Sequence, residues 1–312
     1  MMSNEELELR DNKDNTAFSL AVATGAVEAA QIMLRRNINL ATIRGGERMT
    51  PLYMAALFGR FEMSSGLYSI MEESFQEKDR IGIFFTFINT GLYEISLKMV
   101  EEDTSLAIAR DKDNKTALHL LAQTPSAFDN QSPKGWSKLI KSRLQFRFQR
   151  NLKQAKALEL VRCLWRYVLD LGDEEVMDLI HYPSELLFDA TKLGNFVFLA
   201  ELISSYPDLL WETDRRNRSI IHIAVLNRHA NIFNLIHEIG SIKDILATFE
   251  DDEDNNILHL AAKLPPPERL NTVSGAALQM QQELLWFEVC TSYFLSVYIL
   301  QLYMVAIIIK IF

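Results

Sequence analysis

Thr50-Pro51-Leu52-Tyr53-Met54-Ala55-Ala56 is the stretch that decides the fold, because variants of this phrase return along the 312-residue chain. Each copy opens with a small polar residue and continues with apolar and small residues. Further clear copies begin at Thr16, Thr116, Ser219 and Asn256. From 16 to 50 the spacing is 34 residues. A phrase that returns at this spacing indicates a repeat protein, whose units each contact only their neighbours.

A glycine nine residues after the start marks the first two copies, at Gly25 and Gly59. The same offset applied to Gly91 and Gly194 predicts two weaker copies that begin near residues 82 and 185. The predicted starts are then 16, 50, 82, 116, 185, 219 and 256. The interval from 116 to 185 is about twice as long as the others. We therefore expect an interruption within the fourth unit.

Each unit is predicted to contain two short helices. A Thr or Ser at the start can cap the first helix, and Pro51 suits its first position. A second apolar helix follows, and Asn- and Asp-rich segments before the phrases fit tight turns between units. This period and phrase are typical of ankyrin repeats. The sequence therefore predicts an all-α ankyrin-repeat solenoid of about seven helix-pair units, covering residues 1–123 and 157–289.

The composition favours a binding scaffold over several other classes. The chain is 48% hydrophobic, enough for a continuous core, and its net charge of −9 argues against nucleic-acid binding, which needs a basic surface. Its two cysteines, Cys163 and Cys290, do not form a disulfide framework. The sequence shows no glycine-rich phosphate loop, nucleophile elbow or paired-cysteine zinc pattern. We expect no enzyme activity, no cofactor and no metal.

Three histidines occupy the fourth position of their phrases, namely His119, His222 and His259. They belong to different units, so a shared metal site is not expected. Each imidazole is instead predicted to bond the first residue of its phrase, such as Thr116, and nearby backbone, and so to connect units. Thr50 is predicted to have the same structural role between units. His229 and His237 are predicted to lie at the surface.

Residues 124–156 are predicted to be a basic insertion in the fourth unit. From 134 to 156 there are eight basic residues and no acidic residue, interleaved with apolar ones. One interpretation is an amphipathic element that binds calmodulin or an anionic lipid surface; the other is an insertion loop with a short helix that covers the side of the array. The residues of the candidate element are Trp136, Lys138, Lys141, Arg143, Phe146, Arg147 and Arg150. A helix at 155–169 is expected to be the displaced second helix of this unit.

Residues 290–312 form a hydrophobic tail, predicted to be a C-terminal hydrophobic helix. From 293 to 309 it has 17 residues without a charge, which is the short limit for a membrane span. The rival interpretation is a buried core helix, for which the last unit is expected to offer little covering surface.

The chain resembles the plant ankyrin-repeat membrane proteins that carry a PGG domain, a group associated with defence and stress signalling. The matching stretches lie at 49–57, 157–165, 257–264 and 266–287, and the last, with Leu278-Gln279-Met280-Gln281-Gln282-Glu283-Leu284-Leu285-Trp286, is the most specific. The resemblance covers roughly residues 11–289. It implies association with a membrane, the plasma membrane in this family, and a cytoplasmic array.

Members of that family continue into a PGG segment and several membrane helices, whereas the match here stops at 288–289. We therefore expect residues 290–312 to be an intron-derived or alternatively spliced end, and the start of the chain to be truncated. The expected function is non-enzymatic protein binding in plant signalling at a membrane, through the concave face of turns and first helices. The alternatives are a regulatory membrane or channel-like component, or a soluble cytoplasmic fragment that competes with a full-length relative.

Overall fold

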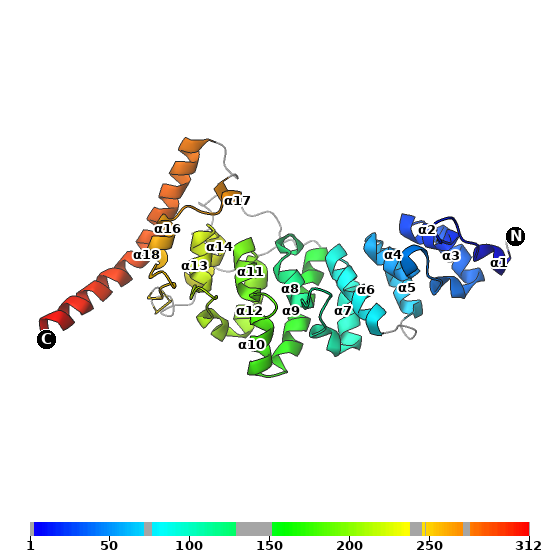
Figure 1. Cartoon of the computed structure of the whole chain (residues 1–312), viewed down its shortest axis with the longest axis horizontal. Coiled ribbons are helices and arrows are strands. Elements are labelled where there is room, and N and C mark those ends of the chain that lie inside the picture. Colours follow the sequence, from blue (N-terminus) through cyan, green and yellow to red (C-terminus); the bar gives the residue numbers. More distant parts are fainter. Residues whose placement is uncertain are drawn as a thin grey trace. The chain divides into compact units, whose positions relative to one another are not determined.

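The protein is described by a computed structural model that covers residues 3–71, 77–128, 152–237, 245–246, 248–270 and 275–311 (Figure 1). For residues 77–78, 236–237, 268 and 295–311 it describes the backbone alone. The chain divides into an N-terminal part, Met1–Met177, and a C-terminal part, Asp178–Phe312. Across the described ranges the structure is helical, with no β-strand and two isolated bridges, Arg10–Thr16 and Thr213–Ser219.

The N-terminal part consists of a short helix, α1 (Asn4–Leu7), followed by helix pairs. The pairs are α2 (Ala17–Thr24) with α3 (Val27–Arg36), α4 (Pro51–Leu57) with α5 (Phe61–Met71), α6 (Glu77–Thr90) with α7 (Tyr93–Glu102), and α8 (Ala117–Ala122) with α9 (Leu152–Leu169). Short 3₁₀ turns, η1 (Ile38–Ala41), η2 (Gly46–Arg48), η4 (Thr104–Ala107) and η5 (Pro125–Ala127), lie between them. First helices pack on first helices, α2 on α4, α4 on α6, and α6 on α8.

The C-terminal part repeats this pattern after α10 (Asp173–His181), which spans the boundary between the two parts. Its helices are α11 (Leu186–Leu193), α12 (Phe196–Ser205), η7 (Pro207–Trp211), α13 (Ile220–Leu226), α14 (Ala230–His237), α16 (Ile257–Ala262), α17 (Pro267–Leu270) and α18 (Ala276–Ile311). The first helices α11, α13 and α16 again pack in sequence.

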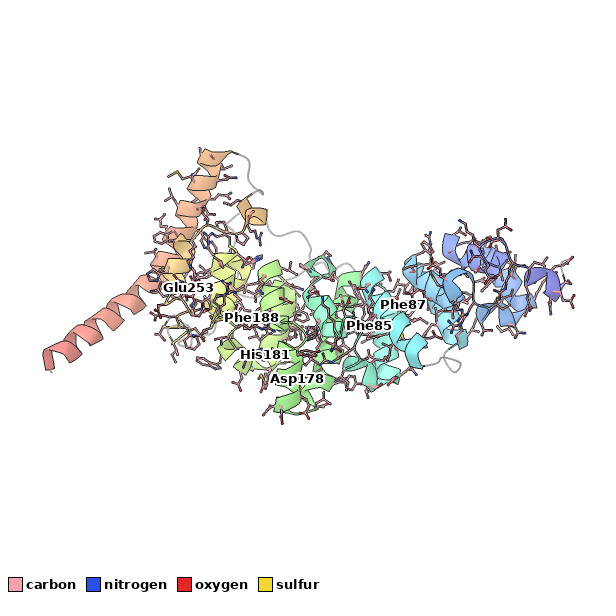
Figure 2. All side chains as sticks on the ribbon, viewed as in Figure 1. Phe85, Phe87, Asp178, His181, Phe188 and Glu253 are labelled. Atoms are coloured by element: carbon pink, nitrogen blue, oxygen red, sulfur yellow. The ribbon has the colours of Figure 1, made fainter. Side chains whose placement is uncertain are left out.

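In α2 and α4 the first residue of the phrase caps the first helix. Thr16 Oγ1 accepts the backbone N–H of Ser19 at 3.1 Å, and Thr50 Oγ1 accepts that of Tyr53 at 3.2 Å. These bonds satisfy donors that a helix start leaves unpaired. Apolar residues of the first helices are buried against neighbouring helices. Phe87 of α6 in the N-terminal part and Phe188 of α11 in the C-terminal part are fully buried (Figure 2). Capping and stacking together explain why short phrases form stable helices.

The observed helices differ from the predicted ones in two places. The helices α2, α4, α8, α11, α13 and α16 each begin one residue after a predicted start, but α6 begins at Glu77 instead of near residue 82. Charged residues at 77–80 extend this helix, which runs through Gly82 without a break. The helix α10 was not predicted, although its first turn, Asp173-Glu174-Glu175, carries the acidic residues that a helix N-terminus favours.

The C-terminal helix α18 packs onto the preceding repeat, which corrects the expectation that this repeat offers little covering surface. Trp286, Cys290 and Phe294 follow one another at four-residue spacing and are 3%, 0% and 5% exposed. Phe233 of α14 meets Trp286 and Phe294 with ring centroids 5.7 and 5.8 Å apart. Burial raises the pKa of the Cys290 thiol to about 12. One face of α18, from Trp286 to Phe294, is thus part of the core of this region.

The predicted membrane span at 293–309 falls largely in the stretch of α18 whose side chains lie outside the described residues. In the described part of the chain, no helix has both the length and the apolar character that crossing a membrane requires.

Arg228 ties α18 to the last repeat. It stands nine residues after the phrase start at Ser219, where other repeats have glycine, and its φ of 59° is left-handed. Its guanidinium donates to the carbonyls of Val225 at 2.8 Å and Lys263 at 2.7 Å, and to Glu283 Oε2 at 2.6 Å. A non-glycine residue keeps such a conformation when the surrounding contacts over-determine it. Arg228 therefore holds two repeats and α18 together.

Replacing Glu283 by Gln is expected to lower the free energy of unfolding of the C-terminal part by about 1 to 2 kcal/mol, since a charge-assisted bond to a largely buried guanidinium is lost. Equilibrium urea unfolding measures this. Glu288→Gln is the matched control, because it removes the same charge from an exposed position of the same helix. Equal effects of the two substitutions would contradict the role given to Arg228.

Candidate functional site

The turns between repeats are built around one aspartate carboxylate. In the turn before α13, Asp214 Oδ1 accepts the backbone N–H groups of Arg216 and Arg218, both at 2.9 Å, while Asn217 adopts a left-handed φ of 55°. The turns that begin at Asp11, Asp111 and Asp251 share this arrangement, with corresponding bonds of 2.8 to 3.0 Å. Asp and Asn tolerate these roles because their short side chains bond nearby backbone. The predicted tight turns thus have a common geometry.

The turn before α4 lacks an aspartate, and the sequence analysis missed it. Its backbone still closes in the same way, with Gly45 N–H donating to the Met49 carbonyl at 2.8 Å and Arg48 N–H to the Gly45 carbonyl at 3.1 Å. Glu47 and Arg48 are left-handed, with φ of 56° and 58°. The Gly45-Gly46 pair was the available signal, because adjacent glycines mark turns.

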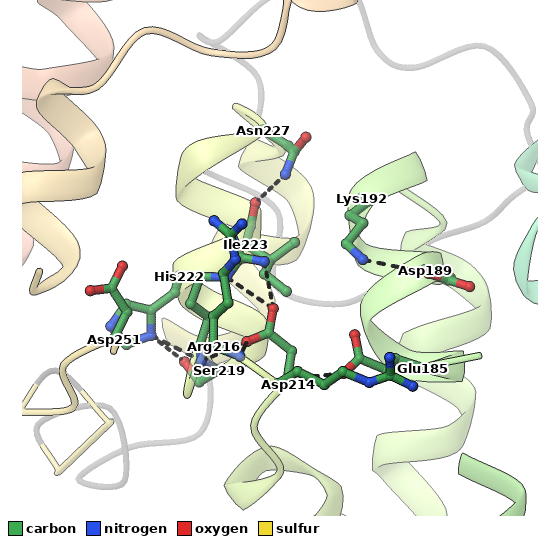
Figure 3. A network of polar contacts seen from close by, with 12 residues as sticks. Glu185, Asp189, Lys192, Asp214, Arg216, Ser219, His222, Ile223, Asn227 and Asp251 are labelled. Carbon is green, nitrogen blue, oxygen red and sulfur yellow. Dashed lines mark hydrogen bonds and ion pairs between the residues drawn. The ribbon is translucent and has the colours of Figure 1, made fainter. Parts of the chain in front are cut away.

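Neighbouring turns are bonded to each other. In the N-terminal part, Asn15 Oδ1 accepts the backbone N–H of Gly46 at 3.0 Å. In the C-terminal part, Asn217 Nδ2 donates to the Glu250 carbonyl at 2.8 Å, and Asp252 N–H donates to the Arg216 carbonyl at 3.0 Å. Figure 3 shows this second region, with Asp214, Arg216 and Asp251 close together. One pair of adjacent turns is therefore joined by hydrogen bonds in each part.

The carboxylate of Asp214 is charged in this setting. Burial alone would raise its pKa, but the Arg218 guanidinium and the backbone N–H groups of Arg218 and Arg216 outweigh burial and hold the pKa below its usual value. Arg218 Nη2 lies 2.6 Å from Asp214 Oδ2. Backbone and side-chain bonds from Asn255 likewise outweigh burial and lower the pKa of Asp251. The negative charge stabilises each turn because several donors converge on it.

Two of the predicted structural histidines lie in the interior. His119 Nδ1 is 2.8 Å from Thr116 Oγ1 and accepts the Thr116 backbone N–H at 3.3 Å. His222 Nδ1 makes the same pair of contacts with Ser219, at 2.8 and 3.3 Å. Since Nδ1 accepts, Nε2 of neutral His222 carries the proton and donates to the Phe249 carbonyl at 3.1 Å. His222 therefore bonds both its own phrase and the segment before the next phrase.

His259 differs because its side chain is exposed. It still caps its own helix, with Nδ1 accepting the Asn256 backbone N–H at 3.3 Å. The three histidines do not converge on a common point, since each bonds the start of its own phrase. Among the residues that the structure describes, no group of three His, Cys, Asp or Glu side chains could hold a metal ion.

The prediction that His229 lies at the surface is wrong. Its side chain is 8% exposed, and its Nε2 donates to the Lys192 carbonyl of the preceding repeat at 2.8 Å, while Arg269 contacts the same ring. The reason is its position: it precedes α14 instead of lying on that helix, and it fills the space beside Gly194. Burial, and then the nearby Arg269 charge, lower the pKa of His229 to about 4. The side chain of His237 lies outside the described residues.

The candidate basic element falls between Phe128 and Leu152 of the sequence. Trp136, Lys138, Lys141, Arg143, Phe146, Arg147 and Arg150 all lie outside the described residues. The structure resumes at Leu152 with α9, which packs against α7 and α8.

Some apolar side chains of the first helices are exposed. We define the first-helix face by three of them, Leu20, Leu57 and Phe58; the residues that match Leu20 in α4 and α13, Met54 and Ile223, are buried. In the N-terminal part, Leu20 of α2 is 46% exposed, and Leu57 and Phe58 at the end of α4 are 46% and 55% exposed. The helices α2 and α4 pack together. In the C-terminal part, Leu193 and Leu264 are exposed at equivalent positions, 48% and 74%.

Similarity to known proteins is found among solved structures. No protein-family model and no curated protein sequence matches the chain. Among solved structures it is similar to the human ASB11 ankyrin repeat domain, with a TM-score of 0.47 and 13% identity over 86% of this chain and 98% of that chain. It is also similar to an ankyrin repeat protein from Leishmania major, with a TM-score of 0.35 and 15% identity over 83% and 77%. At such values neither similarity assigns a partner or a functional residue.

Acid is expected to destabilise the C-terminal part through His229. The folded-state pKa of His229 lies below that of an unfolded histidine. Its contribution to the free energy of unfolding is therefore complete above pH about 6.5 and is lost as the pH falls to about 4. The free energy of unfolding should fall by up to roughly 3 kcal/mol across this window. Burial also lowers the pKa of His222, which adds to the same slope.

The substitution His229→Gln keeps a donor for the Lys192 carbonyl and should flatten this pH dependence. Urea unfolding at a series of pH values measures it. The control is His259→Gln, which alters an exposed side chain of the same part and should leave the dependence as in the original chain. A steep dependence that survives His229→Gln would contradict this account.

Proposed function

We propose that this chain is an ankyrin-repeat protein that binds other proteins and does not itself catalyse a reaction. Three features of the chain support this proposal: the phrase with its capping residue, the two helices of each repeat, and the shared geometry of the turns. In such arrays, binding surfaces are formed by equivalent positions of successive repeats.

The observation that carries this proposal is the exposed apolar group formed by Leu20, Leu57 and Phe58. These side chains belong to helices whose other faces are buried, so the backbone beneath them is held by the core. A partner would remove their remaining surface from water without ordering new backbone. Each large apolar side chain contributes roughly 1.5 to 3 kcal/mol when fully buried, and a few such residues carry most of the energy of an interface.

The turn tips supply polar contacts at the N-terminal ends of the first helices. Their carboxylates are already used within the turns, as for Asp11, whereas the intervening side chains, such as Lys13, are exposed and variable between repeats. An apolar centre beside a polar rim is the usual composition of a protein interface. We therefore assign specificity to the tips and affinity to the first-helix face.

A finer hypothesis rests on the sequence resemblance. Under it, the chain belongs to the plant PGG-domain family and acts in defence or stress signalling at a membrane, with the array in the cytoplasm. The alternatives are a regulatory membrane or channel-like component, and a truncated soluble fragment that competes with a full-length relative. Binding of calmodulin or anionic lipid at 134–156 is a hypothesis from the basic sequence alone.

Replacing Leu57 and Phe58 together by Ser is expected to lower the recovery of binding partners at least about tenfold, because two central apolar side chains are truncated. Quantitative affinity purification of tagged chains from plant extract measures this. The free energy of unfolding should fall by roughly 1 to 3 kcal/mol, since about half of each side chain is buried, and thermal unfolding checks that the variant remains folded.

The matched control is Ile32→Ser with Ile70→Ser, which removes two exposed apolar side chains, 61% and 44% exposed, from the second helices α3 and α5. Partners should be retained by this control. Loss of the same partners in both double variants, or in neither, would refute the assignment of binding to the first-helix face.

A further inference from the structure

The helix α18 carries a row of exposed apolar side chains beside its buried one. Met280, Leu284 and Phe287 are 66%, 60% and 40% exposed. They follow one another at spacings of four and three residues, which places them on one side of the helix. Ala277, three residues before Met280, continues the same row and is also exposed. We call these four residues the α18 seam.

The seam is separate from the contact between α18 and the preceding repeat. That contact is made by Trp286, Cys290 and Phe294, which are buried. The core of the C-terminal part therefore fixes the helix while the seam remains in water. A row of apolar residues at alternating spacings of three and four is typical of a helix that pairs with another helix. The seam shares no residue with the first-helix face.

The charge next to the seam is low for this chain. The net charge of −9 disfavours contact between two copies over most of the surface. Residues 275–282, however, carry no charge. Of the two acidic residues that flank the seam, Glu283 is paired with Arg228, whose Nη2 lies 2.6 Å from Glu283 Oε2, and Glu288 is exposed. A second copy can therefore approach here with little repulsion.

The two flanking glutamates determine in which direction two such helices can pair. Glu283 and Glu288 lie on opposite sides of the seam, five residues apart. In a parallel pair of helices, residues placed in this way face each other across the interface, so Glu283 of one copy would repel Glu288 of the other. In an antiparallel pair, Glu288 lies instead near the uncharged Gln281 of the second copy. The charges thus favour the antiparallel direction.

The sizes of the seam residues also fit an antiparallel pair. With a two-fold axis at the level of Gln282, Met280 of one copy meets Leu284 of the other. Ala277 then meets Phe287, and the small side chain leaves room for the large ring. Each contact occurs twice, as the self-complementary surface of a two-fold dimer requires.

We propose that the seam binds the seam of a second copy, so that the chain forms a dimer through antiparallel pairing of two α18 helices. The two Glu283 side chains approach each other near the axis, and Arg228 of each copy compensates their charge. This interface goes beyond the proposed binding of other proteins, because it uses no residue of the first-helix face.

Sedimentation equilibrium of the full chain, at about 1 to 100 μM, tests the dimer. One helix pair buries a small interface, so a Kd in the micromolar range is expected. Replacing Leu284 by Ser should raise the Kd at least about tenfold, because the central apolar contact is lost in both copies. The matched control is Leu285→Ser, which changes the next residue, 49% exposed and outside the seam, and should keep the original Kd. Circular dichroism checks that both variants are folded.

Cross-linking with a short bismaleimide tests the direction of pairing. In the antiparallel pair, Gln281→Cys places the thiols of the two copies beside each other, and a covalent dimer should form. Glu288→Cys places them about 18 Å apart along the helix axis, so it should form none. The original chain gives the background, since Cys163 and Cys290 are buried.

Several results would overturn the proposal. A monomer at every concentration would show that a second copy does not cover the seam. Equal Kd values for the original chain and Leu284→Ser, or equal weakening by Leu284→Ser and Leu285→Ser, would place self-association elsewhere in the chain. Cross-linking through residue 288 but not through residue 281 would contradict the antiparallel direction.

Discussion

The aspartate carboxylate at the tip of a turn is the interaction on which the rest of the structure depends. In four turns it accepts two backbone N–H groups and allows the residue three positions later to adopt a left-handed conformation. This closure brings the capping Thr, Ser or Asn to the start of the first helix. First helices then stack, and no repeat could bury its own apolar residues without that stacking. The charge of Asp214, held by Arg218, shows how electrostatics and backbone geometry support each other here.

Much of this architecture follows from local sequence, because caps and turns are formed by residues close in the chain. The phrase starts at 16, 50, 116, 185, 219 and 256 each precede a helix by one residue. What could not be predicted depends on distant partners. Arg228 replaces a glycine because Glu283, far along the chain, holds its guanidinium, and His229 is buried because Lys192 and Arg269 enclose it. The exposure of Leu57 and Phe58 also had no local signal, since neighbouring residues of the same phrase are buried.

The residues that stabilise the fold are different from the residues that face the solvent. His119 and His222, the capping residues and the turn aspartates use their polar atoms within the fold. The outward side chains differ from repeat to repeat, and on the first-helix face they are apolar.

The central claim is that partners bind the first helices and turn tips. Hydrogen–deuterium exchange of the chain, alone and with a purified partner, tests it most directly. We predict slower amide exchange at residues 17–24, at 51–60 and in the turns before them, with α3 unchanged. Protection confined to the second helices, with no change at α2 and α4, would contradict the account.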